Sequence, residues 1–260
     1  MNTNLLMSRI MRHAAFVLLA LLMPQVASAQ SSLYGDVNGD GVVNISDVNA
    51  VISVIFDGPP QTDDGHECVD LGLPSGTLWA TMNVGANNPE DYGDYFAWGE
   101  TDPKQRYEWG TYKFGTSMAL TKYCTESDFG TVDNLTELEP ADDAATVNWG
   151  PAWRMPSIEQ MNELVTECDW LWQTVNGVNG YMLTSKHNGN KLFLPAAGCH
   201  MESSIYGAGV DGAYWSRSLE TTFPCDAGYL VLHSSGYVYY CAIYDRYFGQ
   251  SVRPVRVQQN

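Results

Sequence analysis

Hydrophobic positions spaced like one face of a helix occur at two places in the chain. Within residues 158–168 the apolar side chains recur at helical spacing, at Met161, Leu164, Val165 and Cys168. Ser157 comes just before this stripe and Gln160 follows three residues later, which predicts a capping box at the helix N-terminus. A second stripe consists of Val48, Val51, Ile52 and Ile55. The pattern therefore predicts two short amphipathic helices.

Short segments with strand character dominate the rest of the sequence. They are residues 78–84, 94–98, 191–194, 229–233, 237–243 and 251–257. The Ser234-Ser235-Gly236 sequence separates two of them and predicts a hairpin turn. One firm helix among many strands and loops predicts an α+β fold for residues 66–260.

Residues 1–29 have the pattern of a secretory signal peptide. Arg9 and Arg12 precede an apolar run over residues 14–23, and Ala27-Ser28-Ala29 supplies a small-residue cleavage site. The run is well short of the ~20 residues that a membrane helix needs. We therefore expect an exported protein that is secreted, periplasmic or attached to the cell surface, with no membrane span in the mature chain.

Oxygen-bearing side chains alternate along residues 36–47, with Gly41 at the position of the sharp bend. This arrangement is typical of an EF-type calcium loop, because Ca²⁺ takes six or more oxygen ligands and the chain must wrap around it. Val42 would contribute its backbone carbonyl. The sequence predicts Ca²⁺ as the cofactor, with the ligands Asp36, Asn38, Asp40, Val42, Asn44 and Asp47.

The segment Gly35–Val48 resembles a type I dockerin repeat. Dockerins of polysaccharide-degrading bacterial systems normally carry two such repeats, which together bind a cohesin, and this chain has one. The resemblance implies a calcium-binding repeat over residues 33–58 with a role beside polysaccharide breakdown. It leaves open whether a cohesin-like domain is the partner.

Several stretches after the linker at residues 59–65 resemble the bacterial FISUMP (fibrobacter succinogenes major paralogous) domain. They are Val69–Gly76, Tyr95–Thr101, Asp142–Ala145, Trp149–Ser157, Leu194–Gly198, Tyr214–Ser216 and Gly249–Val255. The family is more distantly similar to the C-type-lectin-like fold shared with formylglycine-generating enzymes. The resemblance implies such a domain over residues 66–260, with a binding or adhesive role at the cell surface.

The charge of the chain excludes two classes of partner. The sequence has 13 Lys and Arg against 30 Asp and Glu, a net charge of −17. Removing Arg9 and Arg12 with the signal peptide leaves 11 against 30, a net charge of −19. Nucleic acids and anionic membranes are bound through clustered Lys and Arg. Neither is expected to bind this protein.

The sequence contains no recognisable catalytic motif. Glu100 with Asp102, or Asp142 with Asp143, would be the carboxylate pair of a glycoside hydrolase, but chance pairs are expected among 30 acidic residues. The cysteine motif of formylglycine-generating enzymes has no counterpart here. We therefore expect a non-catalytic protein, with a dockerin-tethered glycan hydrolase as the alternative.

Surface aromatic side chains are candidates for stacking on sugars. Trp98, Trp149, Trp153 and Trp215 lie in the stretches that resemble the family and are expected in the core. The expected ligand-binding residues are Trp109, Trp172 and Tyr244. A glycan or another cell-surface component is the expected ligand, and a purely structural surface protein is a further alternative.

The remaining expectations concern arginine and cysteine. In so acidic a protein we expect Arg154, Arg253 and Arg256 to pair with carboxylates, with Asp142 or Asp143 as the partner of Arg154. The six cysteines of an exported chain permit three disulfides. Cys68 and Cys199 occupy positions where the family pattern has tyrosine, which suggests a bond between them.

Overall fold

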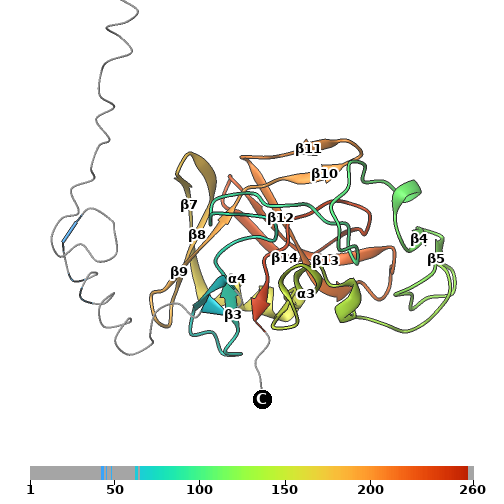
Figure 1. Cartoon of the computed structure of the whole chain (residues 1–260), viewed down its shortest axis with the longest axis horizontal. Helices are drawn as coiled ribbons and strands as arrows, with labels where there is room; N and C mark the ends of the chain where they lie inside the picture. Colours follow the sequence, from blue (N-terminus) through green and yellow to red (C-terminus); the bar gives the residue numbers. More distant parts are fainter. Residues whose placement is uncertain (1–41, 44, 46–47, 49–61, 64, 257–260) are drawn as a thin grey trace, which may run out of the picture. The chain divides into compact units, whose positions relative to one another are not determined.

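The computed structural model describes residues 42, 43, 45, 48, 62, 63 and 65–256 (Figure 1). Contacts divide the chain into two units, Met1–Pro59 and Pro60–Asn260. The predicted signal peptide, the second amphipathic stripe except Val48, and the calcium ligands except Val42 lie outside the described residues. Val42 itself is 57% exposed. The account below concerns the second unit.

The second unit is built mostly of small antiparallel sheets with few helices, a mainly β or α+β architecture. Its strands are β1 Thr62–Asp63, β2 His66–Asp70, β3 Leu78–Ala80, β4 Gly115–Thr116, β5 Ala119–Leu120, β6 Trp153–Arg154, β7 Cys168–Val175, β8 Val178–Ser185, β9 Lys191–Pro195, β10 Cys199–Met201, β11 Ser204–Tyr206, β12 Asp211–Leu219, β13 Asp226–His233, β14 Tyr237–Asp245 and β15 Val255–Arg256. The helices are η1 Trp109–Thr111, η2 Pro140–Asp142, α3 Ala144–Trp149 and α4 Ile158–Glu167.

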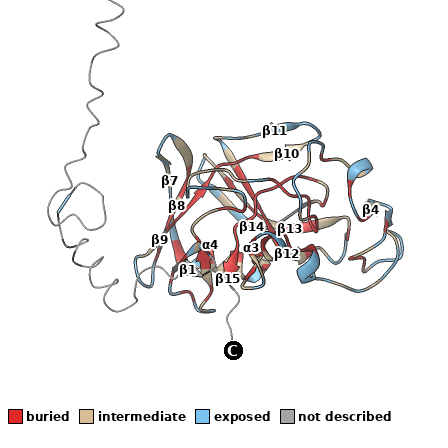
Figure 2. Cartoon of the chain, viewed as in Figure 1, coloured by how far each residue is buried: buried red, intermediate tan, exposed pale blue. Residues whose placement is uncertain are grey.

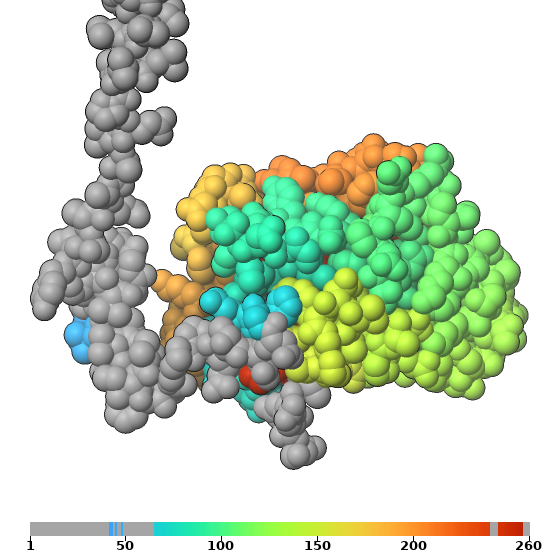
Figure 3. All heavy atoms as spheres, viewed as in Figure 1, coloured from blue at the N-terminus to red at the C-terminus, as the bar shows by residue number. Residues whose placement is uncertain are grey.

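Three sheets organise the unit. One has the order β1-β2-β3-β15-β6, so it joins the beginning and the end of the unit. The other two are the meanders β7-β8-β9 and β12-β13-β14, and β10-β11 and β4-β5 form two-stranded ribbons. The connection between β3 and α4 contains only short elements, and it spreads in green and yellow over much of the face seen in Figure 3.

Helix α4 begins as its sequence predicts. The Ser157 hydroxyl accepts a hydrogen bond from the Gln160 amide, and the Gln160 side chain accepts one from the Ser157 amide, so the capping box is confirmed. The helix ends at Glu167, because β7 begins at Cys168. A second helix, α3, was not predicted; the Asp143 carboxylate caps it by accepting from the Thr146 amide at 2.9 Å.

The predicted hairpin between β13 and β14 is confirmed, with Gly236 at φ 93° in its turn. The strand at 191–194 is also confirmed as β9. Two strand predictions were too long and a third was wrong: 78–84 forms β3 only as far as Ala80, the described residues 251–256 contain only β15, and 94–98 forms no strand apart from a bridge from Phe96 to Gln250. In the last two, single backbone bridges replace continuous ladders.

The interior consists of two clusters of buried apolar side chains. One contains Trp98, Trp153 and Trp215, and the other contains Met161 and Leu164 of α4. The four tryptophans expected in the core, Trp98, Trp149, Trp153 and Trp215, are all buried, which confirms that prediction. Figure 2 shows the buried residues along the central strands and α4, whereas β11 is exposed over its whole length.

Two buried arginines donate their hydrogen bonds to neutral groups and not to carboxylates. Arg253 donates to the Asn83 side chain at 2.8 Å and to the carbonyls of Ala80 and Thr81. The expectation that Arg253 pairs with a carboxylate is therefore wrong. Arg246 donates to the Tyr112 hydroxyl and to backbone carbonyls, and its guanidinium lies 4.8 Å from the Trp98 ring centroid.

Candidate functional site

Two of the three expected ligand-binding aromatics belong to one continuous group of rings. The Trp109 ring lies 5.2 Å from that of Tyr247, Tyr247 lies 4.4 Å from Phe248, and Phe248 lies 4.3 Å from Tyr244. Tyr229 completes the group at 5.7 Å from Tyr244. We call these five residues the aromatic face; Tyr244 is exposed, Trp109, Tyr229 and Tyr247 are partly buried, and Phe248 is buried in the first core cluster. Contacts of this kind contribute about 0.5–1.5 kcal/mol each beyond the area they bury, so the rings support one another.

Sheet geometry explains how the rings come together. Tyr244 on β14 stands opposite Ala227 on β13, and Tyr229 follows Ala227 two residues later. Side chains two apart on a strand point to the same face of a sheet, which brings Tyr229 and Tyr244 together. Since Ala227 has only a methyl group, it leaves room beside Tyr244. Tyr244 remains 40% exposed.

Buried side chains support the Trp109 end of the aromatic face. The Trp109 ring packs edge-on against Tyr112 at 5.4 Å. Tyr112 donates from its hydroxyl to the Trp98 carbonyl and accepts from Arg246, which is fully buried. Burial raises the pKa of Tyr112, so this phenol stays neutral and keeps donating at physiological pH. Trp109 is partly buried and stands on rigid support.

Two more tyrosines extend the exposed aromatic surface of β14. Tyr237 is 55% exposed and Tyr239 is 48% exposed. Their rings are stacked, with centroids 6.1 Å apart and an angle of 22° between planes. Exposed rings in this number on one strand are unusual, because apolar surface gains free energy when it is covered. Strand β14 therefore carries the surface best suited to a ligand with apolar faces.

Trp172 does not join this surface. It lies on β7, in the separate β7-β8-β9 sheet, and packs edge-on against Tyr181 at 5.1 Å. Tyr181 in turn donates to the His233 carbonyl and is buried in the second core cluster. Trp172 is partly buried against that cluster, and Trp109 is partly buried against the first one, so the structure separates Trp172 from Trp109 and Tyr244 in position.

A carboxylate pair lies at the beginning of β13 and the end of β14, on the opposite face of these strands from Tyr229 and Tyr244. Asp226 and Asp245 are opposite each other across the two strands. Donor atoms of Cys225, Asp226 and Asp245 lie within 4.8 Å of one another. Burial and the charge of Asp245 raise the pKa of Asp226 to about 6, and burial raises the pKa of Asp245. Burial also raises the pKa of the Cys225 thiol to about 11, so it carries a proton at neutral pH.

This cluster does not match the expected calcium chemistry. Ca²⁺ takes six to eight oxygen ligands, and Cys225, Asp226 and Asp245 offer two carboxylates and a protonated thiol. The predicted calcium loop at residues 36–47 stays a prediction, since five of its six ligands lie outside the described residues.

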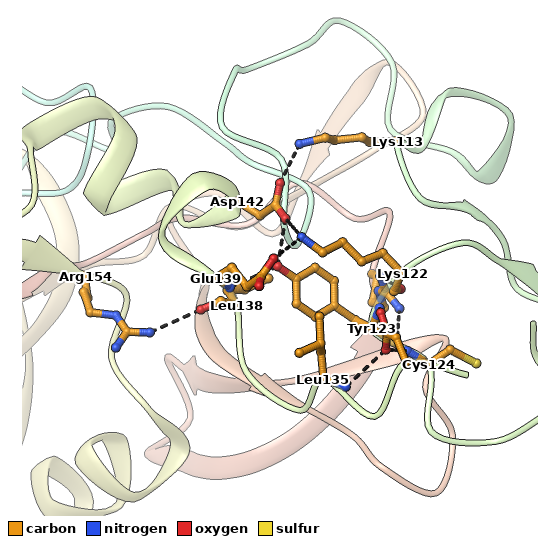
Figure 4. A network of polar contacts seen from close by, with 11 residues as sticks. Lys113, Lys122, Tyr123, Cys124, Leu135, Leu138, Glu139, Asp142 and Arg154 are labelled. Atoms are coloured by element: carbon orange, nitrogen blue, oxygen red, sulfur yellow. Dashed lines mark hydrogen bonds and ion pairs between the residues drawn. The ribbon is translucent and has the colours of Figure 1, made fainter. Parts of the chain in front are cut away.

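Three of the four carboxylates considered for hydrolysis are engaged by other groups. Glu100 is buried and bound by Lys104 at 2.8 Å, whereas Asp102 is exposed. Asp142 accepts from Lys113, Lys122 and the Tyr123 hydroxyl, as Figure 4 shows. These cations lower the pKa of Asp142 against the effect of burial.

Asp143 and Arg154 complete this region. Asp143 is fully buried and accepts from the amides of Thr146 and Met155; burial raises its pKa, although the charge of Arg154 acts against the rise. Arg154 donates to the Leu138 carbonyl at 3.2 Å (Figure 4). Among the described residues no ion pair joins Arg154 to Asp142, which lysines occupy, whereas Arg154 acts on Asp143, the other expected partner, through its charge.

The expected Cys68–Cys199 disulfide is also absent. Cys199 has a free thiol, as do Cys124, Cys168 and Cys225. Cys68 lies on β2, which pairs with β1 and β3, and Cys199 lies on β10, which pairs only with β11 within the named sheets. The two residues therefore belong to different sheets.

Sequence reasoning missed most of the aromatic face. Tyr229, Tyr247 and Phe248 were not singled out, nor were Asp226 and Asp245. The available signal was the run Tyr244-Asp245-Arg246-Tyr247-Phe248, in which three aromatic residues surround two charged ones. That run spans the end of β14 and the turn after it, and such loops commonly carry binding residues.

Comparison with known proteins leaves the identity of the chain open. No protein-family model, no curated protein and no solved structure matches this sequence or its structure. Among the described residues, no helix combines the length and the apolar character needed to cross a membrane.

Proposed function

We propose that the chain is an exported, non-catalytic interaction protein that binds a glycan, or another cell-surface component, through the aromatic face. The observation that supports this proposal is the continuous series of ring contacts from Trp109 through Tyr247 and Phe248 to Tyr244. Sugar rings present apolar C–H faces that stack on exposed aromatic side chains, while polar neighbours fix their orientation. The FISUMP-like, C-type-lectin-like assignment of residues 66–260 belongs to this proposal.

The dockerin-like repeat completes the proposed protein. In this proposal residues 33–58 bind Ca²⁺ and tether or brace the binding domain, in a setting of polysaccharide breakdown, with a cohesin-like domain as a candidate partner. Binding is favoured over hydrolysis because Glu100, Asp142 and Asp143 are each held by cations or backbone amides. A carboxylate that already serves an ion pair is poorly placed to exchange protons with a substrate.

A glycan array with and without Ca²⁺, followed by titration calorimetry on the best ligand, tests the proposal. We expect Trp109→Ala and Tyr244→Ala each to weaken binding by about fivefold or more, since truncating a central aromatic contact costs more than about 1 kcal/mol. Trp172→Ala is the matched control and should bind as the unmodified chain does. No binding on the array, or equal losses in all three variants, would overturn the proposal.

A further inference from the structure

Three exposed tyrosines of β14 share one face of the β12-β13-β14 sheet. Their partners on β13 follow from the register: Tyr237 is opposite His233, Tyr239 is opposite Val231 and Tyr244 is opposite Ala227. Directly opposite residues of an antiparallel pair point to the same face, and the three partners lie an even number of positions apart on β13, as does Tyr229. We call Tyr237, Tyr239, Tyr229 and Tyr244 the tyrosine row.

A β-bulge in β14 brings Tyr244 into this row. From residue 239 to residue 244 the strand advances five positions, whereas β13 advances only four between the opposite residues 231 and 227. Without the extra residue, strand alternation would turn Tyr244 to the opposite face from Tyr239. Bulges re-aim side chains in this way, and they are common at sheet edges and beside functional sites.

The other face of these strands is covered by protein. Leu230, Leu232 and Val238 pack in the second core cluster, which also contains side chains of α4. On the side of the tyrosine row, by contrast, the three tyrosines of β14 are each at least 40% exposed. This is the side of the two strands that a ligand can reach.

The length of the tyrosine row exceeds that of a single sugar. The residues opposite its two ends, His233 and Ala227, are six positions apart on β13, so the row is about 20 Å long. At its Tyr244 end the row continues through Phe248 into the rest of the aromatic face. The aromatic side chains therefore offer a line of contacts for several consecutive sugar rings.

Polar groups lie at the Tyr237 end of the row. Asp211 of β12 is opposite His233, and its carboxylate is 3.4 Å from His233 Nε2. The Ser235 hydroxyl is 2.7 Å from His233 Nδ1. The Asp211 and His233 side chains are both 42% exposed. Such groups can hydrogen-bond sugar hydroxyls and fix the position of a glycan on the apolar surface beside them.

We propose that the tyrosine row and the aromatic face together bind an extended stretch of a linear neutral polysaccharide, such as a β-1,4-linked glucan, mannan or xylan; this inference rests on the proposed function. Equatorial linkages keep such a chain straight, so consecutive sugars follow the row, whereas an α-1,4-linked glucan coils away from it. Contacts on one linked chain reinforce one another, and affinity rises with chain length until the row is filled. The net charge of −17 disfavours acidic polysaccharides.

Titration calorimetry on the mature chain tests the chain-length dependence. The probes are cellohexaose, β-1,4-mannohexaose and xylohexaose, the disaccharide of each, and maltohexaose as the coiled control. We expect at least one of the three straight hexamers to bind about tenfold or more tightly than its disaccharide and than maltohexaose, because it contacts at least two additional tyrosines at more than about 1 kcal/mol each.

Substitutions connect the gain in affinity to the tyrosine row. The double variant Tyr237→Ala with Tyr239→Ala should remove most of the gain and leave the affinity of the disaccharide unchanged, since Tyr244 is retained. Leu171→Ala removes a side chain that is 64% exposed on β7, in another sheet, and should keep the gain. Far-ultraviolet circular dichroism checks that each variant is folded.

The outcomes separate this inference from the proposed function. Binding of none of the straight hexamers, equal affinity for hexamer and disaccharide, equal affinity for maltohexaose, or an unchanged gain in the tyrosine double variant overturns the extended-chain ligand; a glycan bound on the array then leaves the proposed function standing. Absence of any glycan binding overturns both.

A second copy of this chain is the alternative occupant of the tyrosine row, because β14 is an edge strand of its sheet within the described residues. Analytical ultracentrifugation measures the oligomeric state. We expect a monomer, whereas a dimer that the tyrosine double variant dissociates would overturn the assignment of the row to a glycan.

Discussion

Replacing Asp226 by asparagine should stabilise the protein at pH 7.5. The carboxylate of Asp226 is partly buried and faces Asp245 across the strands, and its pKa rises from 3.8 to about 6 for these reasons. A shift of roughly 2 units corresponds to about 3 kcal/mol of unfavourable free energy for the charged form. Solvent reaches the pair and screens it, so we expect a gain of about 1–2 kcal/mol. Asparagine keeps the shape and the hydrogen-bonding capacity of the side chain without the charge.

The pH dependence follows from the direction of the shift. The folded state holds the Asp226 proton more tightly than the unfolded state does, so the unmodified protein loses stability as pH rises from about 4 to about 6. Above that range the loss is complete, and below it both states are protonated. In Asp226→Asn this part of the pH profile should be absent. The two proteins should therefore have the same stability near pH 4 and differ most above pH 6.5.

Thermal unfolding of the mature chain, followed by calorimetry between pH 4 and pH 8 at a fixed Ca²⁺ concentration, measures the effect. A gain of 1–2 kcal/mol in a unit of this size raises the melting temperature by about 2–8 °C. The double variant with Asp245→Asn should gain further stability, because burial by itself raises the pKa of Asp245 and disfavours its charged form. A lower melting temperature for Asp226→Asn at pH 7.5 would refute the reasoning and would indicate that the carboxylate holds a favourable partner.

Two further predictions concern the core and the calcium loop. Arg253→Met should lower the free energy of unfolding in guanidinium titrations by about 2–4 kcal/mol, because Asn83 and two backbone carbonyls lose their donor in the interior; an unchanged midpoint would contradict this. Ca²⁺ should raise the melting temperature of the mature chain, and the double variant Asp36→Ala with Asp40→Ala should abolish that rise, whereas a rise that persists would place the bound ion elsewhere.

Local signals in the sequence predicted local structure well. The capping box at Ser157 and Gln160 involves residues three apart, and no distant part of the chain is needed to form it. The turn at Ser234-Ser235-Gly236 is equally local. One such signal was overlooked: Asn176 and Gly177 have φ of 48° and 86° and connect β7 to β8. An Asn-Gly pair between strand-like segments is a strong indication of a hairpin.

Long-range partners could not be predicted in the same way. Arg253 was expected to find a carboxylate, but the carbonyls of β3 and the next residue supply its acceptors instead. The Cys68–Cys199 disulfide was expected from the residue types at two positions of the family pattern, but the structure places the two cysteines in different sheets. Trp109 and Tyr244 were singled out separately, and only the packing of η1 against the segment after β14 joins them through Tyr247.

The segment from Tyr244 to Phe248 consists of the end of β14 and the turn after it. Its structure shows how such a segment can be ordered without a bound ligand. Arg246 lies in the middle of this segment and is fully buried among aromatic rings and carbonyl groups. It anchors the backbone between Asp245 and Tyr247, so the carboxylate and the ring on either side are held in fixed positions. A surface that is ordered before binding loses less conformational entropy when the ligand arrives. The hydrogen-bond partners of Arg246 are all neutral, so its guanidinium keeps a positive charge in the interior directly beside Asp245 in the chain.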